Sequence, residues 1–109
     1  ELLLRAFDNL IRNALQHAGR GCRIEIEVHQ ESDDMLVIEI ADNGPGVADN
    51  NLTSIFQPFF RSNNNPGDGL GLAITKRAIE VHGGTISAHN RTTGGLCMHV
   101  RLPCTVQLD

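Results

Sequence analysis

The chain has 109 residues, a net charge of −4 and a pI of about 5.6, which fits one domain and excludes the strongly basic surface of nucleic-acid-binding proteins. Apolar residues make up 40% of it, with no Trp or Tyr and four Phe, so the core is predicted to be mostly aliphatic. The three cysteines, Cys22, Cys97 and Cys104, are widely spaced, which favours reduced thiols over a disulfide framework or a C-x-x-C zinc site.

Residues 2–18 have the pattern of an amphipathic helix that Gly19 and Gly21 end. Apolar residues at spacings of three and four form one stripe: Leu3, Ala6, Phe7, Leu10, Ile11, Ala14, Leu15 and Ala18. Because the sequence starts at Glu1 inside this pattern, we expect a fragment of a longer chain. No segment approaches the ~20 apolar residues of a membrane helix, and no signal peptide is visible.

Two strands are predicted at 22–30 and 35–42, joined as a hairpin by the polar turn Glu31–Asp34. Apolar and charged residues alternate along the first strand, so one of its two faces should be exposed to solvent.

The second half of the chain begins with a short helix around 49–56 and a loop at 61–69. A helix is expected at 70–82, followed by strands at 85–90 and 96–102. The predicted inner face of this helix consists of Leu70, Ile74, Ala78 and Val81. This order of elements predicts a two-layer α/β sandwich with helices on one face of the sheet.

Several polar groups do not fit a plain core. Asn9, Asn13 and His17 are spaced four apart and share one helix face, although Asn is a weak helix former. A carboxamide oxygen suits Mg²⁺, while the alternative is two solvent-facing asparagines.

Asp42 has the parity of the apolar residues of its strand, so its carboxylate should point to the covered side and needs a partner there. An adenine amine could be that partner, and Gly44 and Gly46 could let the backbone approach a flat ligand. The alternative is an Asx-type turn, in which Asp42 caps its own loop.

Two further segments suit phosphate binding. Gly67–Leu72 has three alternating glycines before a helix, which favours an anion at the helix N-terminus, or else forms a flexible hinge. Ile55–Arg61 holds three of the four Phe, so it could anchor a lid from which Arg61 reaches a polyphosphate. The alternative is a hydrophobic plug with Arg61 in solvent.

Together, these segments resemble the N, G1, F and G2 boxes of the sensor histidine kinases, which share a superfamily with gyrase, mismatch-repair and heat-shock chaperone ATPases. The similarity runs from Arg5 to Leu102, with Asn9–Ala14 as the N box, Asp42–Gly46 as G1, Ile55–Arg61 as F and Gly67–Ile74 as G2.

The resemblance implies the Bergerat (GHKL) ATP-binding fold, an α/β two-layer sandwich of a mixed, mainly antiparallel sheet covered on one face by helices. Residues 1–109 would be the catalytic domain, with the first strand and the phosphoacceptor domain upstream. It also implies contacts with ATP and Mg²⁺ by the following residues: Asn9, Asn13, His17, Asp42, Gly44, Gly46, Val47, Arg61, Gly69, Leu70, Gly71 and Leu72.

Individual roles follow from the same resemblance. Asn13 would bind Mg²⁺, Asn9 would hold phosphate or water, and Arg61 would approach the γ-phosphate. Asp42 would accept from the adenine amine, and His17 takes the place of an aromatic ring near adenine. The ATPase relatives have a glutamate at the position of Asn9 that activates water, so its absence fits a kinase.

The implied activity is transfer of the γ-phosphate to a histidine on an upstream dimeric helical hairpin. None of the five histidines of this chain lies in such a context, so the fragment alone should not phosphorylate itself. The implied partners are its own dimerisation domain in a parent homodimer and a response regulator, with no nucleic acid. The implied location is the cytoplasmic part of a bacterial inner-membrane protein.

Three departures from the family pattern reduce positive charge near the triphosphate. Gln16 replaces a common lysine, the lid Ser62–Pro66 has no second basic residue, and Asp68 adds a carboxylate. We therefore expect modest ATP affinity with strong Mg²⁺ dependence. Competing hypotheses are an anti-sigma-type serine kinase, a nucleotide-binding module without activity, and a plain α/β interaction domain.

Overall fold

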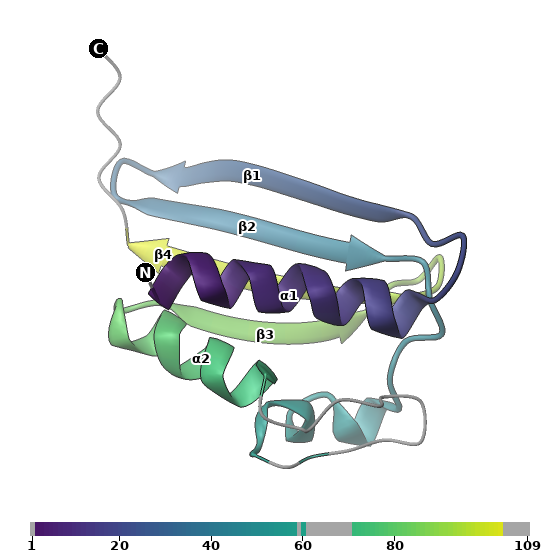
Figure 1. Ribbon diagram of the computed structural model, residues 1–109. Helices are drawn as coiled ribbons and strands as arrows, with labels where there is room; N and C mark the ends of the chain where they lie inside the picture. Colours follow the sequence, from purple (N-terminus) through teal and green to yellow (C-terminus); the bar gives the residue numbers. More distant parts are fainter. Residues whose placement is uncertain (1, 59, 61–70, 104–109) are drawn as a thin grey trace.

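The computed structural model describes residues 2–58, 60 and 71–103. The element order is helix, two strands, two short 3₁₀ helices, helix and two strands (Figure 1). Their bounds are α1 Leu2–Ala18, β1 Ile24–Ser32, β2 Met35–Asp42, η1 Asp49–Asn51, η2 Ser54–Phe56, α2 Gly71–Val81, β3 Thr85–Asn90 and β4 Leu96–Pro103. The predicted helices and strands are confirmed, although β1 begins and ends two residues later than expected, and the short helix expected at 49–56 consists of the two 3₁₀ turns. The loop predicted at 61–69 lies outside the described residues.

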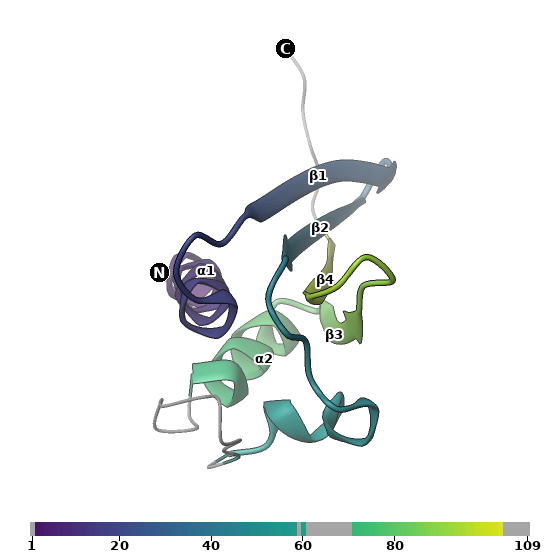
Figure 2. The same cartoon turned by 90° about the vertical axis from the view of Figure 1, so that its right-hand side faces the viewer.

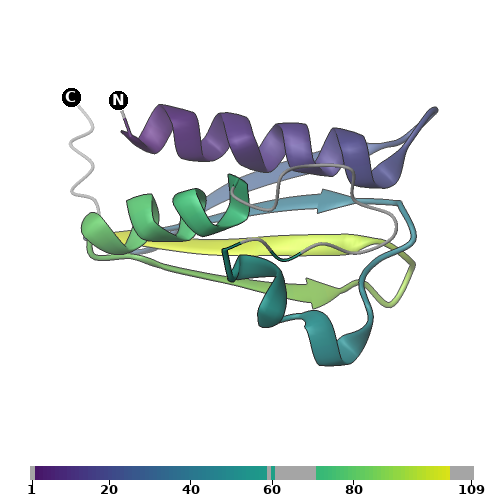
Figure 3. The same cartoon turned by 60° about the horizontal axis from the view of Figure 1, so that its bottom comes forward.

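The four strands form one sheet in the order β1-β2-β4-β3, and every described pairing is antiparallel. The predicted mixed sheet is therefore fully antiparallel among the described residues. Ile26, Ile40, Met98 and Ala88 are partners in register across the four strands, so they share one face. Both helices cover that face and lie side by side, which gives the predicted two-layer sandwich (Figures 2 and 3).

The core fills the space between this face and the helices. It is mainly aliphatic, as predicted, and its buried members are Ala6, Leu10, Ala14, Ile40, Ile55, Phe56, Ala78, Ile79, Leu96, Met98, Val100 and Leu102. Short side chains on α1 let the helix lie close to α2 and to the sheet.

The predicted inner face of α2 is wrong in two places. Ile74 and Val81 are 52% and 57% exposed, while Thr75, Ala78 and Ile79 are buried. Thr75 can face inward because its hydroxyl donates to the carbonyl of Ala6 on α1 at 3.5 Å. Leu70, the remaining predicted member, lies outside the described residues.

The apolar face of β1 is only partly covered. Ile26 and Val28 are 51% and 61% exposed, although they point to the helix side of the sheet. The sequence predicted that only one face of this strand is exposed to solvent, and this is wrong, because both faces are largely exposed. The reason is that β1 is the edge strand and extends beyond α1 (Figure 2). No helix in the described residues is long and apolar enough to cross a membrane.

Candidate nucleotide site

Asp42 is the last residue of β2, and its carboxylate lies on the helix-covered side of the sheet. The residue is 2% exposed, which confirms the burial predicted from the alternation of apolar residues along this strand. Its Oδ1 accepts two backbone hydrogen bonds, from the N–H of Gly44 at 2.9 Å and from the N–H of Leu96 at 3.2 Å. The Asx-type turn is thus confirmed for this oxygen. Because two amides hold Oδ1, the carboxylate has a fixed orientation, with Oδ2 4.0 Å from Nδ1 of His17.

His17 lies in the last turn of α1, and its side chain is 8% exposed. Its Nδ1 is buried and has no hydrogen-bond partner within the part of the chain that the structure describes. Buried polar atoms of folded proteins are nearly always paired. The unpaired ring nitrogen of His17 and the carboxylate oxygen of Asp42 therefore lie side by side at the end of α1, in a buried polar pair.

Asn9 and Asn13 continue the row of His17 along α1 at one-turn intervals. Both are half-buried. Asp8, the carboxylate beside this row, is exposed and paired with Arg12 at 2.9 Å. The row therefore offers amide groups and no free carboxylate.

Residues 43–48 form the loop that follows β2, called here the Asp42 loop. Its glycines are explained by packing of the chain on itself. A Cβ on Gly44 would lie 2.6 Å from the Cα of Ala18, because the loop rests on the end of α1. Gly46 has a φ of +76°, and a Cβ there would lie 2.6 Å from Oδ1 of Asn90. These contacts account for both glycines without the approach of a ligand.

Asn90, at the end of β3, is a positioning residue that the sequence did not indicate. Its Oδ1 accepts from the N–H of Val47 at 2.9 Å, and its Nδ2 donates to the carbonyl of Val47 and to Oδ1 of Asp49 at 3.0 Å. One side chain thus fixes the segment around Val47 and Asp49. Its partners are more than 40 positions away, so no local pattern could have shown it.

Replacing Asn90 by alanine should lower the free energy of unfolding by about 1–3 kcal/mol, because the part-buried N–H and carbonyl of Val47 lose their partners. Asn50→Ala, at an exposed position of η1, is the matched control and should cost much less. Urea denaturation of the two variants measures the difference, and equal midpoints would refute the positioning role.

The β3–β4 loop also touches Asp42 directly. Nη1 of Arg91 donates to the carbonyl of Asp42 at 2.9 Å, while Nη2 pairs with Oε1 of Glu25 at 3.3 Å. Gly95 lies so close that a Cβ would fall 1.9 Å from the same carbonyl. The Asp42 loop is therefore held by its own turn, by α1 and by the β3–β4 loop.

The remaining predicted site residues are placed less completely. Ile55 and Phe56 are buried and Lys76 stacks over the Phe56 ring at 5.9 Å from its centroid, so the predicted aromatic anchor belongs to the core. Gly71 begins α2, and no described atom lies within 4 Å of a Cβ built on it. Leu72 packs partly buried against the core.

Arg61, Gly69 and Leu70 lie outside the described residues, as do the departures Ser62–Pro66 and Asp68. Gln16, the remaining departure from the family pattern, is exposed.

On the sheet face opposite α1 and α2, Cys97 of β4 is buried between the neighbouring strands β2 and β3 and donates to Oε2 of Glu39 at 3.7 Å. Burial, together with the charge of Glu39, raises the pKa of the Cys97 thiol from 9.0 to about 11. The pKa of Glu39 is lowered, mainly by its hydrogen bond from His99. Cys97 is therefore a neutral thiol near pH 7.

Alkylation by iodoacetamide at pH 8 should accordingly be much slower at Cys97 than at the more accessible Cys22. The raised pKa lowers the thiolate fraction of Cys97 about a hundredfold, relative to a thiol with a pKa of 9.0. The favoured protonated form also means that the contribution of Cys97 to stability is complete below pH 9 and is lost as the pH rises toward 11. Mass spectrometry of a Cys104→Ser protein resolves the two sites, and equal rates would contradict the buried neutral thiol.

Comparison with known proteins identifies the family of this chain. Residues 1–106 match the family of histidine kinase-, DNA gyrase B- and HSP90-like ATPases. The chain is 44% identical over 105 residues to the sensor protein KdpD of Escherichia coli K12, covering 94% of this chain and 12% of KdpD. It spans 27% of the sensor protein SphS of Synechococcus elongatus, so it matches a minor part of both relatives.

Solved structures show the same fold. The mycobacterial sensor histidine kinase MprB superposes with a TM-score of 0.83 at 33% identity, over 91% of this chain and 68% of that one. The histidine kinase ThkA, in a complex with the response regulator protein TrrA, superposes with a TM-score of 0.76 at 28% identity, over 93% of this chain and 28% of that one.

Proposed function

Because the chain belongs to the family of histidine kinase-, DNA gyrase B- and HSP90-like ATPases, we propose that it binds Mg²⁺–ATP and donates the γ-phosphate to a histidine of a sensor kinase. That histidine lies on an upstream dimerisation domain of the parent homodimer. From there the phosphoryl group passes to a response regulator.

The observation that carries this proposal is the buried pair of Asp42 and His17. Two backbone amides hold Oδ1 of Asp42, so Oδ2 is free to accept one hydrogen bond from the exocyclic amine of adenine. The unpaired Nδ1 of His17 lies on the same edge. Val47, held by Asn90, packs beside the base.

Along α1, the row from His17 to Asn9 extends about 12 Å from the adenine end, at ~1.5 Å per residue. Asn13 holds Mg²⁺ through its carboxamide oxygen, and the ion neutralises charge on the phosphates. Asn9 binds phosphate or water nearby. The N-terminus of α2 receives the phosphates together with Gly69, Leu70 and Leu72, and Arg61 approaches the γ-phosphate; among the described residues, no atom lies within 4 Å of a Cβ built on Gly71.

The choice of a kinase over an ATP hydrolase rests on the same row. A hydrolase needs a base that activates water, and Asn9 has no basic oxygen for that task. Asp8 is turned to solvent and paired with Arg12. Positioning and charge neutralisation are then the main contributions of the chain to phosphoryl transfer.

The partners follow from the relatives. A complex of ThkA with the response regulator TrrA is known among the structural neighbours, and a response regulator is proposed here by extension. We place the chain on the cytoplasmic side of a bacterial inner-membrane sensor protein.

Incubation of the full-length protein with γ-labelled ATP tests the proposed activity. Label should enter the protein as an acid-labile, base-stable phosphohistidine, and Asn13→Ala should prevent this while leaving the fold intact. Asn50→Ala, on an exposed 3₁₀ turn, is the control and should be labelled normally. Steady release of inorganic phosphate from a protein that is never labelled would instead identify an ATP hydrolase.

A further inference from the structure

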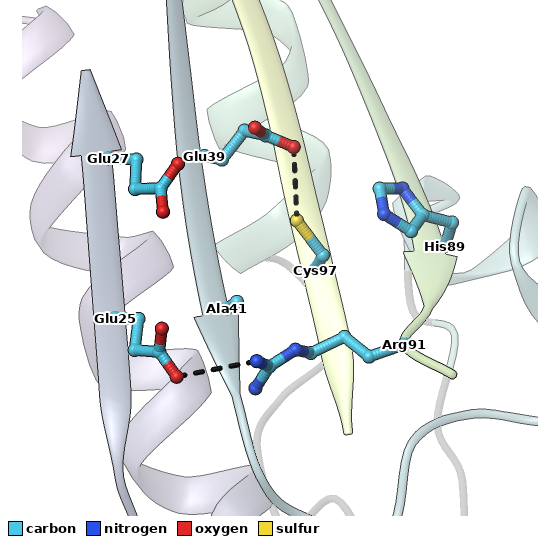
Figure 4. A pocket seen from close by; sticks show the side chains of 7 residues that line it. All are labelled: Glu25, Glu27, Glu39, Ala41, His89, Arg91 and Cys97. Carbon is cyan, nitrogen blue, oxygen red and sulfur yellow. Dashed lines mark hydrogen bonds and ion pairs between the residues drawn. The ribbon is translucent and has the colours of Figure 1, made fainter. Parts of the chain in front are cut away.

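A polar cavity of about 210 Å³ lies on the sheet face opposite Asp42. Side chains from all four strands and from the β3–β4 loop surround it: Glu25, Glu27, Glu39, Ala41, His89, Arg91 and Cys97 (Figure 4). Three carboxylates and one guanidinium give it an excess of negative charge, and that guanidinium is paired with Glu25 at 3.3 Å. The cavity therefore favours a cation over an anion.

Strand register brings three different ligand types together in this cavity. Ala41, Cys97 and His89 are partners across β2, β4 and β3, and Glu39 lies two residues before Ala41 on the same face. A carboxylate oxygen of Glu39, a ring nitrogen of His89 and Sγ of Cys97 all lie within 4.8 Å of one another. Figure 4 shows Glu39 and Cys97 facing each other, with His89 on the neighbouring strand.

The distances fit a tetrahedral metal ion. Zn–S and Zn–O bonds of about 2.3 and 2.0 Å in tetrahedral geometry place sulfur and oxygen about 3.5 Å apart. Sγ of Cys97 and Oε2 of Glu39 are 3.7 Å apart. His89 is exposed, so its ring can turn toward the pair without repacking the core.

A further side chain fixes one of these ligands from outside. Nδ1 of His99 lies 3.4 Å from Oε2 of Glu39, its register partner across β2 and β4. Hydrogen bonds of this kind orient metal ligands and strengthen binding.

We propose that Glu39, His89 and Cys97 form a site for a borderline-soft divalent cation of the Zn²⁺ type on the sheet face opposite α1 and α2. Thiolate and imidazole ligands favour this class over Mg²⁺ and Ca²⁺, which take oxygen ligands. The thiol proton of Cys97 leaves to solvent as the sulfur–metal bond forms, and water completes the coordination. The absence of a C-x-x-C motif does not argue against the site, since three separate strands supply the ligands.

Titration with Co²⁺, a spectroscopic substitute for Zn²⁺, tests the site directly. In a Cys22→Ser, Cys104→Ser background, Cys97 is the single thiol of the chain. We expect one Co²⁺ per chain, with the visible bands of tetrahedral cobalt and a thiolate-to-cobalt charge-transfer band, and Zn²⁺ should displace it. Absence of a thiolate band would overturn the proposal.

Variants then assign the ligands. Cys97→Ser should abolish the charge-transfer band, and His89→Gln, at an exposed position where folding is not at risk, should weaken Co²⁺ binding more than about 100-fold. His99→Gln should weaken it about 10- to 100-fold, as expected for an outer hydrogen bond. His82→Gln is the matched control, because His82 is exposed and lies away from the cavity.

Asp42→Asn should change Co²⁺ affinity only slightly, because the charge of Asp42 is a minor influence on the Cys97 thiol, and this separates the site from the proposed nucleotide site on the other face. Unchanged binding in His89→Gln would overturn the assignment.

Discussion

Asp42→Asn is expected to weaken ATP binding about 100-fold or more while the protein stays folded. The amide oxygen of asparagine can still accept from the N–H groups of Gly44 and Leu96, so the loop keeps its turn. The amide NH₂ replaces Oδ2 and presents a donor to the donor amine of adenine. A hydrogen bond to a charged group contributes about 1.5–3 kcal/mol, and each ~1.4 kcal/mol is a factor of ten in affinity.

Asp42→Ala is the informative contrast. It removes the acceptor for both backbone N–H groups, so it should also lower the free energy of unfolding, by about 1–3 kcal/mol for the buried N–H of Leu96 and by less for the part-buried N–H of Gly44. Asp33→Asn, in the exposed β1–β2 turn, is the matched control for the loss of charge. Calorimetry with Mg²⁺–ATP and thermal melting separate the two effects, and wild-type affinity in Asp42→Asn would show that Oδ2 does not contact the nucleotide.

Gly95→Ala should be the most destabilising single substitution in the loops around Asp42. Its Cβ would fall 1.9 Å from the carbonyl oxygen of Asp42 and 2.9 Å from Cα of Asn43, and both are backbone atoms that cannot turn away. The β3–β4 loop must then move, which breaks the hydrogen bonds from Leu96 and Arg91 to Asp42.

Gly94→Ala provides a matched control for this prediction. The φ values of Gly94 and Gly95 are +104° and +100°, so an alanine at either position should cause a similar backbone strain of about 1–2 kcal/mol. A Cβ on Gly94 meets nothing within 4 Å, unlike one on Gly95. The free energy of unfolding should therefore fall by about 3 kcal/mol more for Gly95→Ala than for Gly94→Ala. Equal urea midpoints for the two variants would show that the close approach is not important.

Features with a local cause were predictable from the sequence. Alternation along β2 placed Asp42 on the covered face, and turn chemistry after it indicated the Asx-type turn. Periodicity alone failed where a polar residue could be satisfied inside the core. Thr75 takes an inward position on α2 because the carbonyl of Ala6 accepts its hydroxyl, and this rotates Ile74 to solvent.

Features with a long-range cause could not be predicted. Asn90 and Arg91 reach the Asp42 loop only because β3 and β4 bring residues more than 40 positions apart into contact. The cluster of Glu39, His89 and Cys97 likewise depends on strand order and register, which no spacing in the sequence encodes.

We propose that Oδ2 of Asp42 accepts a hydrogen bond from the exocyclic amine of adenine. This contact is tested by comparing the affinity of Mg²⁺–ATP with that of the triphosphate of purine riboside, which differs from ATP only by lacking this amine. The wild-type chain should bind the deamino analogue about 10- to 100-fold more weakly, and Asp42→Asn should abolish this preference. Equal affinities of the wild-type chain for the two nucleotides would contradict the account.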